Sequence, residues 1–404
     1  MKINYDFSNF GRTILTGAGV NGITRVTEEL ALAIFNELDQ SSDFLEFSTD
    51  YYPQAAPYID RHFDALGISL KTAKDSSFNR FIYDYFVSKK LPFHKGRGLG
   101  KFLGYESSMR EVDVFYSPFF PPLTRRREKS RAVFLTIHDI ISETSPQFFT
   151  PGHVKSMSRV YRSIVEKGDY FFAVSHYTKN QFCEYFDVSE DRVFVTELGV
   201  GERIAGVASD DDEAVLNKYG LSMDQPYLLC LATLEPRKNM ITLLKAFESL
   251  RGTLKNERLK LVMCGSAGWG YSSSMKLIES SNYLRNNVII TGFVPDQDIG
   301  PLYRCALSFC YIPFEEGFGL PPLEAMSCGV PVISSSTSSI PEVVGNAGLL
   351  VDPSSIEDVR ENIKMVLLDD ELRMYLSRAG IERAKRFTWK KTAQNMINFF
   401  SEKG

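Results

Sequence analysis

Two glutamates, Glu316 and Glu324, flank a glycine-rich stretch of the sequence. Prolines follow the glycines, and Gly329 comes a few residues later. Proline favours the first turn of a helix and glycine the position after its last turn, so the pattern predicts a loop and then a short helix, with Glu324 in the first turn. Unpaired amides and the positive end of a helix dipole attract phosphate. We therefore predict a phosphate-binding loop formed by Gly317, Phe318, Gly319 and Leu320.

The two carboxylates allow two interpretations. Taken singly, Glu324 is a partner of the helix dipole and Glu316 is a solvated loop residue. Taken together, they contact one ligand at two points, because seven residues of loop and helix separate them. The glycines between them favour the second interpretation, since glycine lets a ligand come close to the backbone.

Arg237 and Lys238 stand together where an apolar strand, beginning at Tyr227, leads into a predicted helix. Arginine offers a planar fork of donors and lysine a mobile point charge, so the pair suits a diphosphate. A surface pair without a function is the alternative.

His138 and Asp139 follow the apolar run 132–137, which predicts a buried parallel strand. Open α/β sheets bind ligands at the carboxyl ends of their strands, so His138 lies at a candidate site. A lone histidine is more often an ordinary surface or core residue. No cluster with metal-ligand spacing accompanies it, and the sequence predicts no metal site.

Gly17, Gly19 and Gly22 match the dinucleotide pattern GxGxxG, which makes an NAD-dependent oxidoreductase an alternative. That pattern requires glycines directly after the first strand. Here the predicted strand ends near Phe7, well before Gly17, although the next predicted strand does end at an acidic residue, Asp50.

The whole chain has the composition of an ordinary globular protein. Its 404 residues suit two domains of about 200 residues each. A formal net charge of −4, with 24% charged residues, shows no overall excess of positive charge that would indicate a nucleic-acid partner. Six cysteines form no CxxC pair and follow no signal peptide, which predicts reduced thiols and a cytoplasmic location. No apolar run reaches the roughly 18 residues that span a bilayer.

Residues 80–131 are locally basic, with twelve Lys and Arg against five Asp and Glu. Aromatic residues and glycines interleave with the charges. One interpretation is a solvated surface. The other is a peripheral contact with an anionic membrane or a lipid-pyrophosphate acceptor.

The run from Glu316 to Gly329 resembles the donor-site signature of the family 4 retaining glycosyltransferases, which have the GT-B fold. The run 233–239 resembles their phosphate-binding turn, although many members carry the arginine where Thr233 stands here. The resemblance implies two Rossmann-like domains facing across a cleft, residues 1–204 and 205–388. It also implies that a final helix, residues 389–404, crosses back to the first domain.

The resemblance also implies roles for individual residues. Glu316 and His138 would contact the donor sugar at the catalytic centre, and Glu324 would hold the nucleotide ribose. Arg237 and Lys238 would bind the donor phosphates. Gly19 and Gly22 would line the phosphates through their backbone, and Phe293 and Val294 would border the nucleobase.

The implied activity is retaining transfer of a hexose from a nucleotide-diphosphate sugar to a glycan or lipid-linked glycan acceptor, without metal or other cofactor. The form of the run 234–239 resembles bacterial polysaccharide mannosyltransferases, so we predict GDP-mannose as donor and a place in cell-surface polysaccharide synthesis, such as that of the O-antigen of lipopolysaccharide. The predicted location is the cytoplasm, at the inner face of the membrane. A GT-B-fold sugar-nucleotide epimerase and a non-catalytic nucleotide-sugar-binding protein remain alternatives, beside the oxidoreductase.

Overall fold

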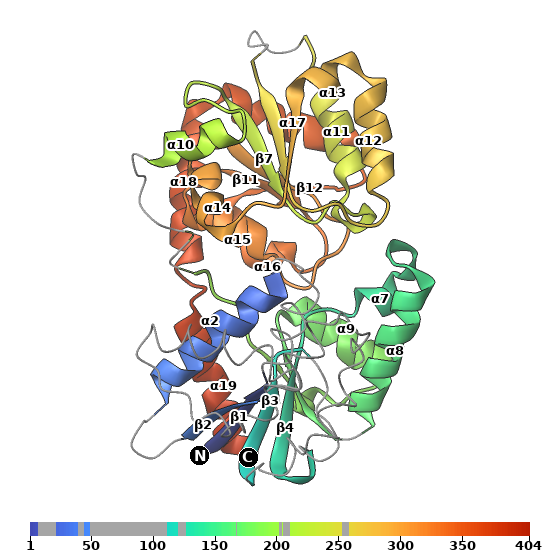
Figure 1. The fold of residues 1–404 in the computed structure, drawn as a ribbon, viewed down its shortest axis with the longest axis vertical. Coiled ribbons are helices and arrows are strands. Elements are labelled where there is room, and N and C mark those ends of the chain that lie inside the picture. Colours follow the sequence, from blue (N-terminus) through green and yellow to red (C-terminus); the bar gives the residue numbers. More distant parts are fainter. Residues whose placement is uncertain are drawn as a thin grey trace, which may run out of the picture.

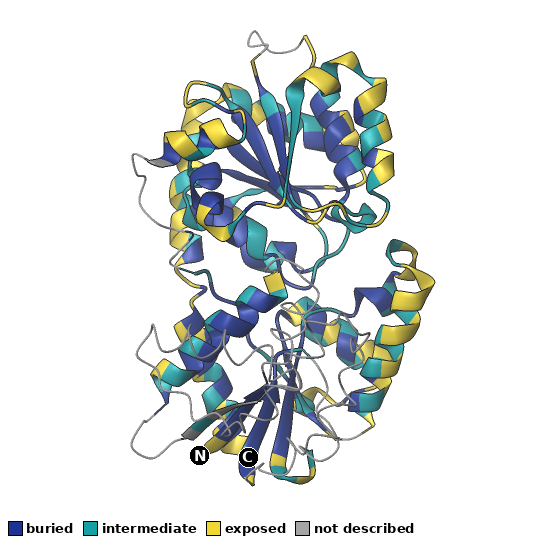
Figure 2. Ribbon diagram, in the orientation of Figure 1, coloured by how far each residue is buried: buried dark blue, intermediate teal, exposed yellow. Residues whose placement is uncertain are grey.

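A computed structural model shows two α/β lobes, each built on a six-stranded parallel sheet (Figure 1). The structure describes residues 1–6, 22–38, 44–48, 111–119, 127–166, 168–201, 204, 211–252 and 258–404. The central strands are dark blue in both lobes of Figure 2, while edge strands such as Val288–Gly292 are of intermediate burial and the outer faces of the helices are exposed. The predicted buried parallel strands are therefore confirmed.

The first lobe carries a sheet in the order β2-β1-β3-β4-β5-β6. Its central strands are apolar because helices cover both faces, and Tyr5, Phe134 and Phe172 have no exposed surface. The first described helix of this lobe begins at Gly22. The elements are β1 (Lys2–Asp6), α2 (Gly22–Glu37), β2 (Phe44–Ser48), β3 (Val112–Ser117), β4 (Ser130–Ile137), α7 (Ile141–Thr144), η2 (Pro146–Phe148), α8 (Pro151–Val165), β5 (Tyr170–Ala173), α9 (His176–Phe186), η3 (Glu190–Arg192) and β6 (Val193–Val195).

The second lobe repeats the theme in the order β12-β11-β10-β7-β8-β9. Strands β10 and β11 are buried along their whole length, so the loops that follow them start from a rigid base. The elements are α10 (Asp211–Lys218), β7 (Tyr227–Leu231), η4 (Pro236–Lys238), α11 (Met240–Ser249), β8 (Lys260–Cys264), α12 (Tyr271–Ser280), α13 (Asn282–Asn287), β9 (Val288–Gly292), α14 (Asp296–Arg304), β10 (Ser308–Tyr311), α15 (Leu320–Ser327), β11 (Val332–Ser335), α16 (Ile340–Val344), η5 (Gly345–Ala347), β12 (Leu349–Val351), α17 (Ile356–Leu368) and α18 (Asp370–Ala384).

The last helix, α19 (Trp389–Lys403), returns to the first lobe and packs on α2, as Figure 1 shows. The apolar face of α19 packs into the hydrophobic core of the first lobe. Phe400 is fully buried, with its ring 4.9 Å from that of Phe134 and 5.7 Å from that of Tyr116. The predicted return of the final helix is confirmed. Within the described part of the chain, no helix is both long and apolar enough to span a membrane.

Candidate active site

The glycine loop joins β10 to α15, as predicted. Gly319 has φ 118°, a conformation that favours glycine, and it lets the helix begin directly at Leu320. Gly329, with φ 73°, follows the helix. The amide of Val330 then bonds the carbonyl of Ala325 at 3.0 Å, which ends the helix in the manner expected of glycine.

Glu324 is the fifth residue of α15, so the prediction that it lies in the first turn is wrong. The helix starts earlier than the prolines suggested, because the left-handed conformation of Gly319 already turns the chain into it. Glu324 is buried, and it contacts side chains rather than the amides at the helix start.

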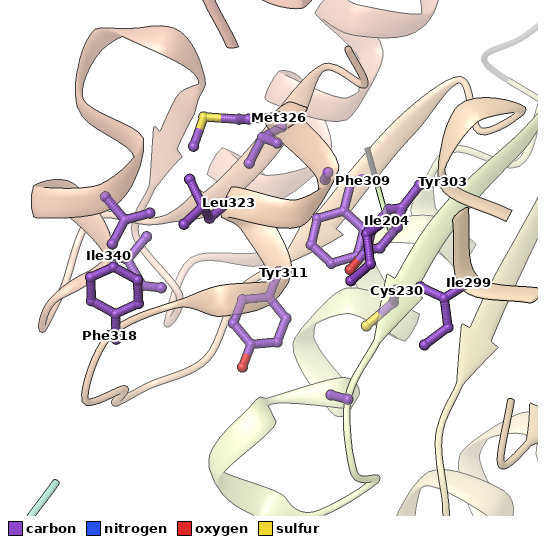
Figure 3. Close-up of a cluster of buried hydrophobic side chains, with 14 of the residues drawn as sticks. Ile204, Cys230, Ile299, Tyr303, Phe309, Tyr311, Phe318, Leu323, Met326 and Ile340 are labelled. Atoms are coloured by element: carbon purple, nitrogen blue, oxygen red, sulfur yellow. The ribbon is translucent and has the colours of Figure 1, made fainter. Parts of the chain in front are cut away.

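The backbone amides of the loop have no acceptor within the described part of the chain. Among the described residues, no hydrogen bond is donated by the backbone N–H of Gly317, Phe318, Gly319 or Leu320. The side chain of Phe318 is buried and lies beside Ile340 in the apolar cluster of Figure 3, so only its backbone can face a ligand. These amides lie at the start of α15, where helix N-termini favour anions, and their role in binding phosphate stays a prediction.

Glu316 is the centre of a charged cluster. Its Oε1 atom accepts hydrogen bonds from the Tyr311 hydroxyl at 2.5 Å and from Arg237 Nη1 at 3.0 Å, and it forms an ion pair with Lys238. Burial raises the pKa of Glu316, but Lys238 and Arg237 outweigh burial and lower it to about 2. The carboxylate is therefore charged, and it can accept hydrogen bonds from sugar hydroxyls.

Arg237 and Lys238 come from the short helix η4, which is the next element after β7. Both side chains are only 12% exposed, so they are not a solvated surface pair. Arg237 Nη2 also pairs with Glu235 at 2.9 Å, and its Nε has no partner among the described residues. Burial and the adjacent Arg237 lower the pKa of Lys238, although Glu316 opposes them. A diphosphate would bring a second negative group to this lysine.

His138 follows β4 at the carboxyl end of the first sheet, as predicted. Its Nε2 donates to the carbonyl of Pro118 at 2.7 Å, and burial lowers the pKa of the imidazole. The ring is thus neutral with its proton on Nε2, which leaves Nδ1 as an acceptor. Gly317 of the other lobe packs against the backbone of His138, because a Cβ on Gly317 would lie 1.7 Å from the His138 carbonyl oxygen.

Helix α9 of the first lobe also contacts the second lobe. The carbonyl of Gly317 accepts hydrogen bonds from Ser175 Oγ at 2.6 Å and Thr178 Oγ1 at 2.9 Å. Glu342 of α16 accepts from the backbone amides of His176 at 2.8 Å and Tyr177 at 2.6 Å, at the start of α9. Glu342 thus ties the two lobes together.

Sequence and fold comparisons identify the chain's family. Residues 211–383 match the family model described as Glycosyl transferases group 1. The chain is 33% identical over 287 residues to the O-antigen chain mannosyltransferase B of Escherichia coli, covering 71% of this chain and 74% of that protein. The chain belongs to the group 1 glycosyl transferases. The predicted recognition as a glycosyltransferase is confirmed.

Two further proteins extend the comparison. This glycosyltransferase is 31% identical over 238 residues to the serotype-specific mannosyltransferase WbdA of Escherichia coli, covering 58% of this chain and only 29% of that longer protein. It superposes on Anabaena HepE, solved in complex with UDP and glucose, with a TM-score of 0.69 and 17% identity over the full length of both chains. The predicted GT-B fold is confirmed.

The remaining predicted site residues belong to two other segments of the chain. Gly22 is the first residue of α2, whereas Gly17 and Gly19 lie outside the described residues. Between β9 and α14 of the glycosyltransferase, Val294 is buried and Phe293 is 51% exposed. The roles assigned to these residues stay predictions.

Sequence reasoning missed three side chains of the site. Tyr311 ends β10 and donates to Glu316, Glu235 pairs with Arg237, and Arg25 of α2 pairs with Glu324 across the two lobes. Tyr311 and Glu235 stand close in sequence to residues that were predicted, so their neighbours were a usable signal. No sequence signal pointed to Arg25, because its partner lies 299 positions away.

Other predictions concern metals and membranes. Within the described ranges, no three His, Cys, Asp or Glu side chains are grouped so as to hold a metal ion. Most of the basic region 80–131 lies outside those ranges. In its described part, Arg127 pairs with Asp169 and Arg131 lies 3.8 Å from Asp113, so these two charges already have partners.

Proposed function

We propose that this glycosyltransferase moves mannose from GDP-mannose, with retention of anomeric configuration and without a metal ion, to a glycan or lipid-linked glycan acceptor of a bacterial surface polysaccharide. The relatives named as mannosyltransferases support the sugar and the pathway. The retaining course and the metal independence rest on the resemblance to family 4.

The observation that carries the proposal is the cluster around Glu316. Arg237 and Lys238 are cations with only 12% of each side chain exposed, and the amides from Gly317 to Leu320 have no acceptor within the described chain. Fixed donors aimed at a leaving group stabilise the charge that develops on it. Such donors suit a departing nucleoside diphosphate, whose phosphates would be bound without a bridging metal.

The sugar would lie between Glu316 and His138. The charged carboxylate of Glu316 accepts hydrogen bonds from sugar hydroxyls, and His138 accepts one at Nδ1. Gly317, which follows Glu316, packs against the backbone of His138, so the two lobes are in contact at this point. Closure excludes water, which would otherwise compete with the acceptor hydroxyl.

The first test is thermal stabilisation of the purified protein by GDP, UDP, ADP, their common sugars and NAD, in EDTA. A ligand that binds only the folded state raises the melting temperature with the logarithm of its saturation. We expect GDP and GDP-mannose to raise the melting temperature clearly and the other ligands to raise it only weakly. Stabilisation by NAD alone would end the proposal, and stabilisation by UDP alone would reassign the donor.

The second test is transfer. With GDP-mannose and an extract of glycolipid acceptors, we expect an α-mannosyl product by NMR and unchanged rates in EDTA. Conversion of the sugar nucleotide without an acceptor would indicate an epimerase, and binding without turnover would indicate a non-catalytic protein. A β-linked product would contradict retention.

We also propose peripheral membrane contact through residues 80–131, on the inner face of the membrane. Sedimentation with liposomes measures it. We expect the protein in the pellet only when the liposomes contain anionic lipid, and equal recovery in the supernatant would contradict the proposal.

A further inference from the structure

Arg25 of the first lobe reaches into the donor site of the second. It is the fourth residue of α2. Its Nη1 atom lies 2.6 Å from Glu324 Oε1, and its Nη2 atom lies 3.0 Å from Asp296 Oδ1. The Arg25 side chain is 20% exposed and that of Glu324 only 6%, so this ion pair is largely removed from solvent.

Glu324 keeps spare capacity as an acceptor. A carboxylate has about four lone-pair positions. Arg25 occupies one on Oε1, and the Tyr303 hydroxyl donates to Oε2 at 3.2 Å. About two positions therefore remain, which equals the number of hydroxyls on a ribose.

The charge on Glu324 depends on its neighbours. Burial raises the pKa of this carboxyl, and Arg25 on α2 opposes that rise. From α14, the Tyr303 hydroxyl also lowers the pKa, whereas the carboxylate of Asp296 raises it. Cys328, directly after α15, is the other titratable group nearby. Arg25 is thus the one positive group facing Glu324 among the described residues.

We propose that Arg25 is a positioning residue of the donor site, which holds the Glu324 carboxylate in place and charged so that its two free acceptor positions receive the ribose hydroxyls of the nucleotide. The inference rests on the proposed function, because it takes Glu324 as the ribose-binding residue. Since Arg25 belongs to the first lobe, ribose recognition in the second lobe then depends on closure of the two lobes.

The test measures nucleotide affinity of the full chain by calorimetry, with GDP and 2′,3′-dideoxy-GDP. For Arg25→Met we expect GDP to bind about tenfold more weakly at neutral pH, as for loss of a charged hydrogen bond. The dideoxy nucleotide, which lacks both hydroxyls, should bind the wild type and the variant alike. Arg25→Lys should recover part of the lost affinity, because it restores the charge without the fork.

The pH profile gives a readout that packing alone would not move. Because Arg25 opposes the rise in the pKa of Glu324, its removal raises that pKa further. As the pH falls, GDP affinity should therefore decline at a higher pH in Arg25→Met than in the wild type. Because dideoxy-GDP carries the same diphosphate, comparison with it corrects for the effect of nucleotide titration on affinity.

Glu342→Gln is the matched control, since it weakens another contact between the lobes without touching Glu324. Equal losses for GDP and dideoxy-GDP in Arg25→Met, unchanged GDP affinity, or tighter GDP binding would each overturn the proposal. If the wild type binds neither GDP nor UDP nor ADP, the proposed function falls with it. If the wild type binds GDP and Arg25→Met and Arg25→Lys bind it equally well, only the role of Arg25 is refuted.

Discussion

The carbonyl oxygen of Gly317 accepts a hydrogen bond from the hydroxyl of Ser175 at 2.6 Å, across the two lobes. The same hydroxyl caps α9 by accepting from the Thr178 amide at 3.0 Å, so its position is fixed. In a trans peptide the C=O and the following N–H point in opposite directions. The contact therefore turns the amide of Phe318 away from α9. A helix of the first lobe thus orients an amide of the loop that is predicted to bind phosphate in the second.

Substitution of Gly317 by alanine should prevent this closed arrangement. A Cβ there would lie 1.7 Å from the His138 carbonyl oxygen, and backbone cannot yield as a flexible side chain can. We expect kcat/KM for transfer to fall about 100-fold, the effect of misplacing reacting groups by about 1 Å. Nucleotide affinity should fall less, because Lys238 and Arg237 lie within the second lobe and only the contact of Arg25 with Glu324 would be lost with closure. Steady-state kinetics and calorimetry measure the two effects.

Gly152→Ala is the control for this change, because nothing lies within 4 Å of a Cβ at that position of α8. It should retain full activity. Wild-type turnover by Gly317→Ala would show that catalysis does not need the contact with His138.

Glu316→Gln should lower kcat while leaving nucleotide affinity nearly unchanged. The substitution keeps the shape of the side chain but removes the charge that Lys238 and Arg237 stabilise. We expect a fall in kcat of about 100-fold, typical for loss of one preorganised electrostatic contact. Glu235→Gln, which removes another partner of Arg237, is the matched control and should cost far less. If nucleotide affinity fell as far as kcat, Glu316 would not act on the sugar.

Glu324→Gln should have the opposite effect, with weaker nucleotide binding and a smaller change in kcat at saturating donor. Loss of a charged hydrogen bond corresponds to about 10- to 100-fold in affinity. Asp296→Asn is the control, since it removes the other partner of Arg25 and leaves the Glu324 carboxylate intact. Normal GDP affinity in Glu324→Gln would remove this residue from the ribose site.

The parts of the site that follow directly from a strand or start a helix could be predicted from sequence. His138, Lys238 and the loop after Glu316 all lie at carboxyl ends of strands, where local patterns mark both the strand and the residue after it. The exact start of α15 could not be predicted from sequence, because Gly319 adopts a left-handed conformation that the positions of the prolines do not reveal.

Contacts between the lobes could not be predicted at all. The bonds from Ser175 to Gly317 and from Arg25 to Glu324 join residues 142 and 299 positions apart. Ser175 caps α9 through a local contact with Thr178, but its second bond depends on how the lobes close. Such bonds are set by tertiary packing, and a single sequence carries no local signal for them.

Acid should destabilise the wild type more than Glu316→Gln. The pKa of Glu316 is lowered from 4.5 to about 2 in the folded protein, so its stabilising effect is complete above the unfolded value and is lost as the pH falls towards 2. This shift corresponds to about 3 kcal/mol at neutral pH. Urea denaturation between about pH 6 and pH 3 should show the advantage of the wild type shrinking as the pH falls.

Glu382→Gln provides the control, because its partner Lys385 and the glutamate itself are both mostly exposed. Exposed ion pairs of this kind contribute little, so this variant should follow the wild type at every pH. A constant difference between wild type and Glu316→Gln across the range would mean that the carboxylate stays protonated, or gains nothing from Lys238 and Arg237. The charged state of Glu316, on which its proposed contact with the sugar depends, would then be wrong as well.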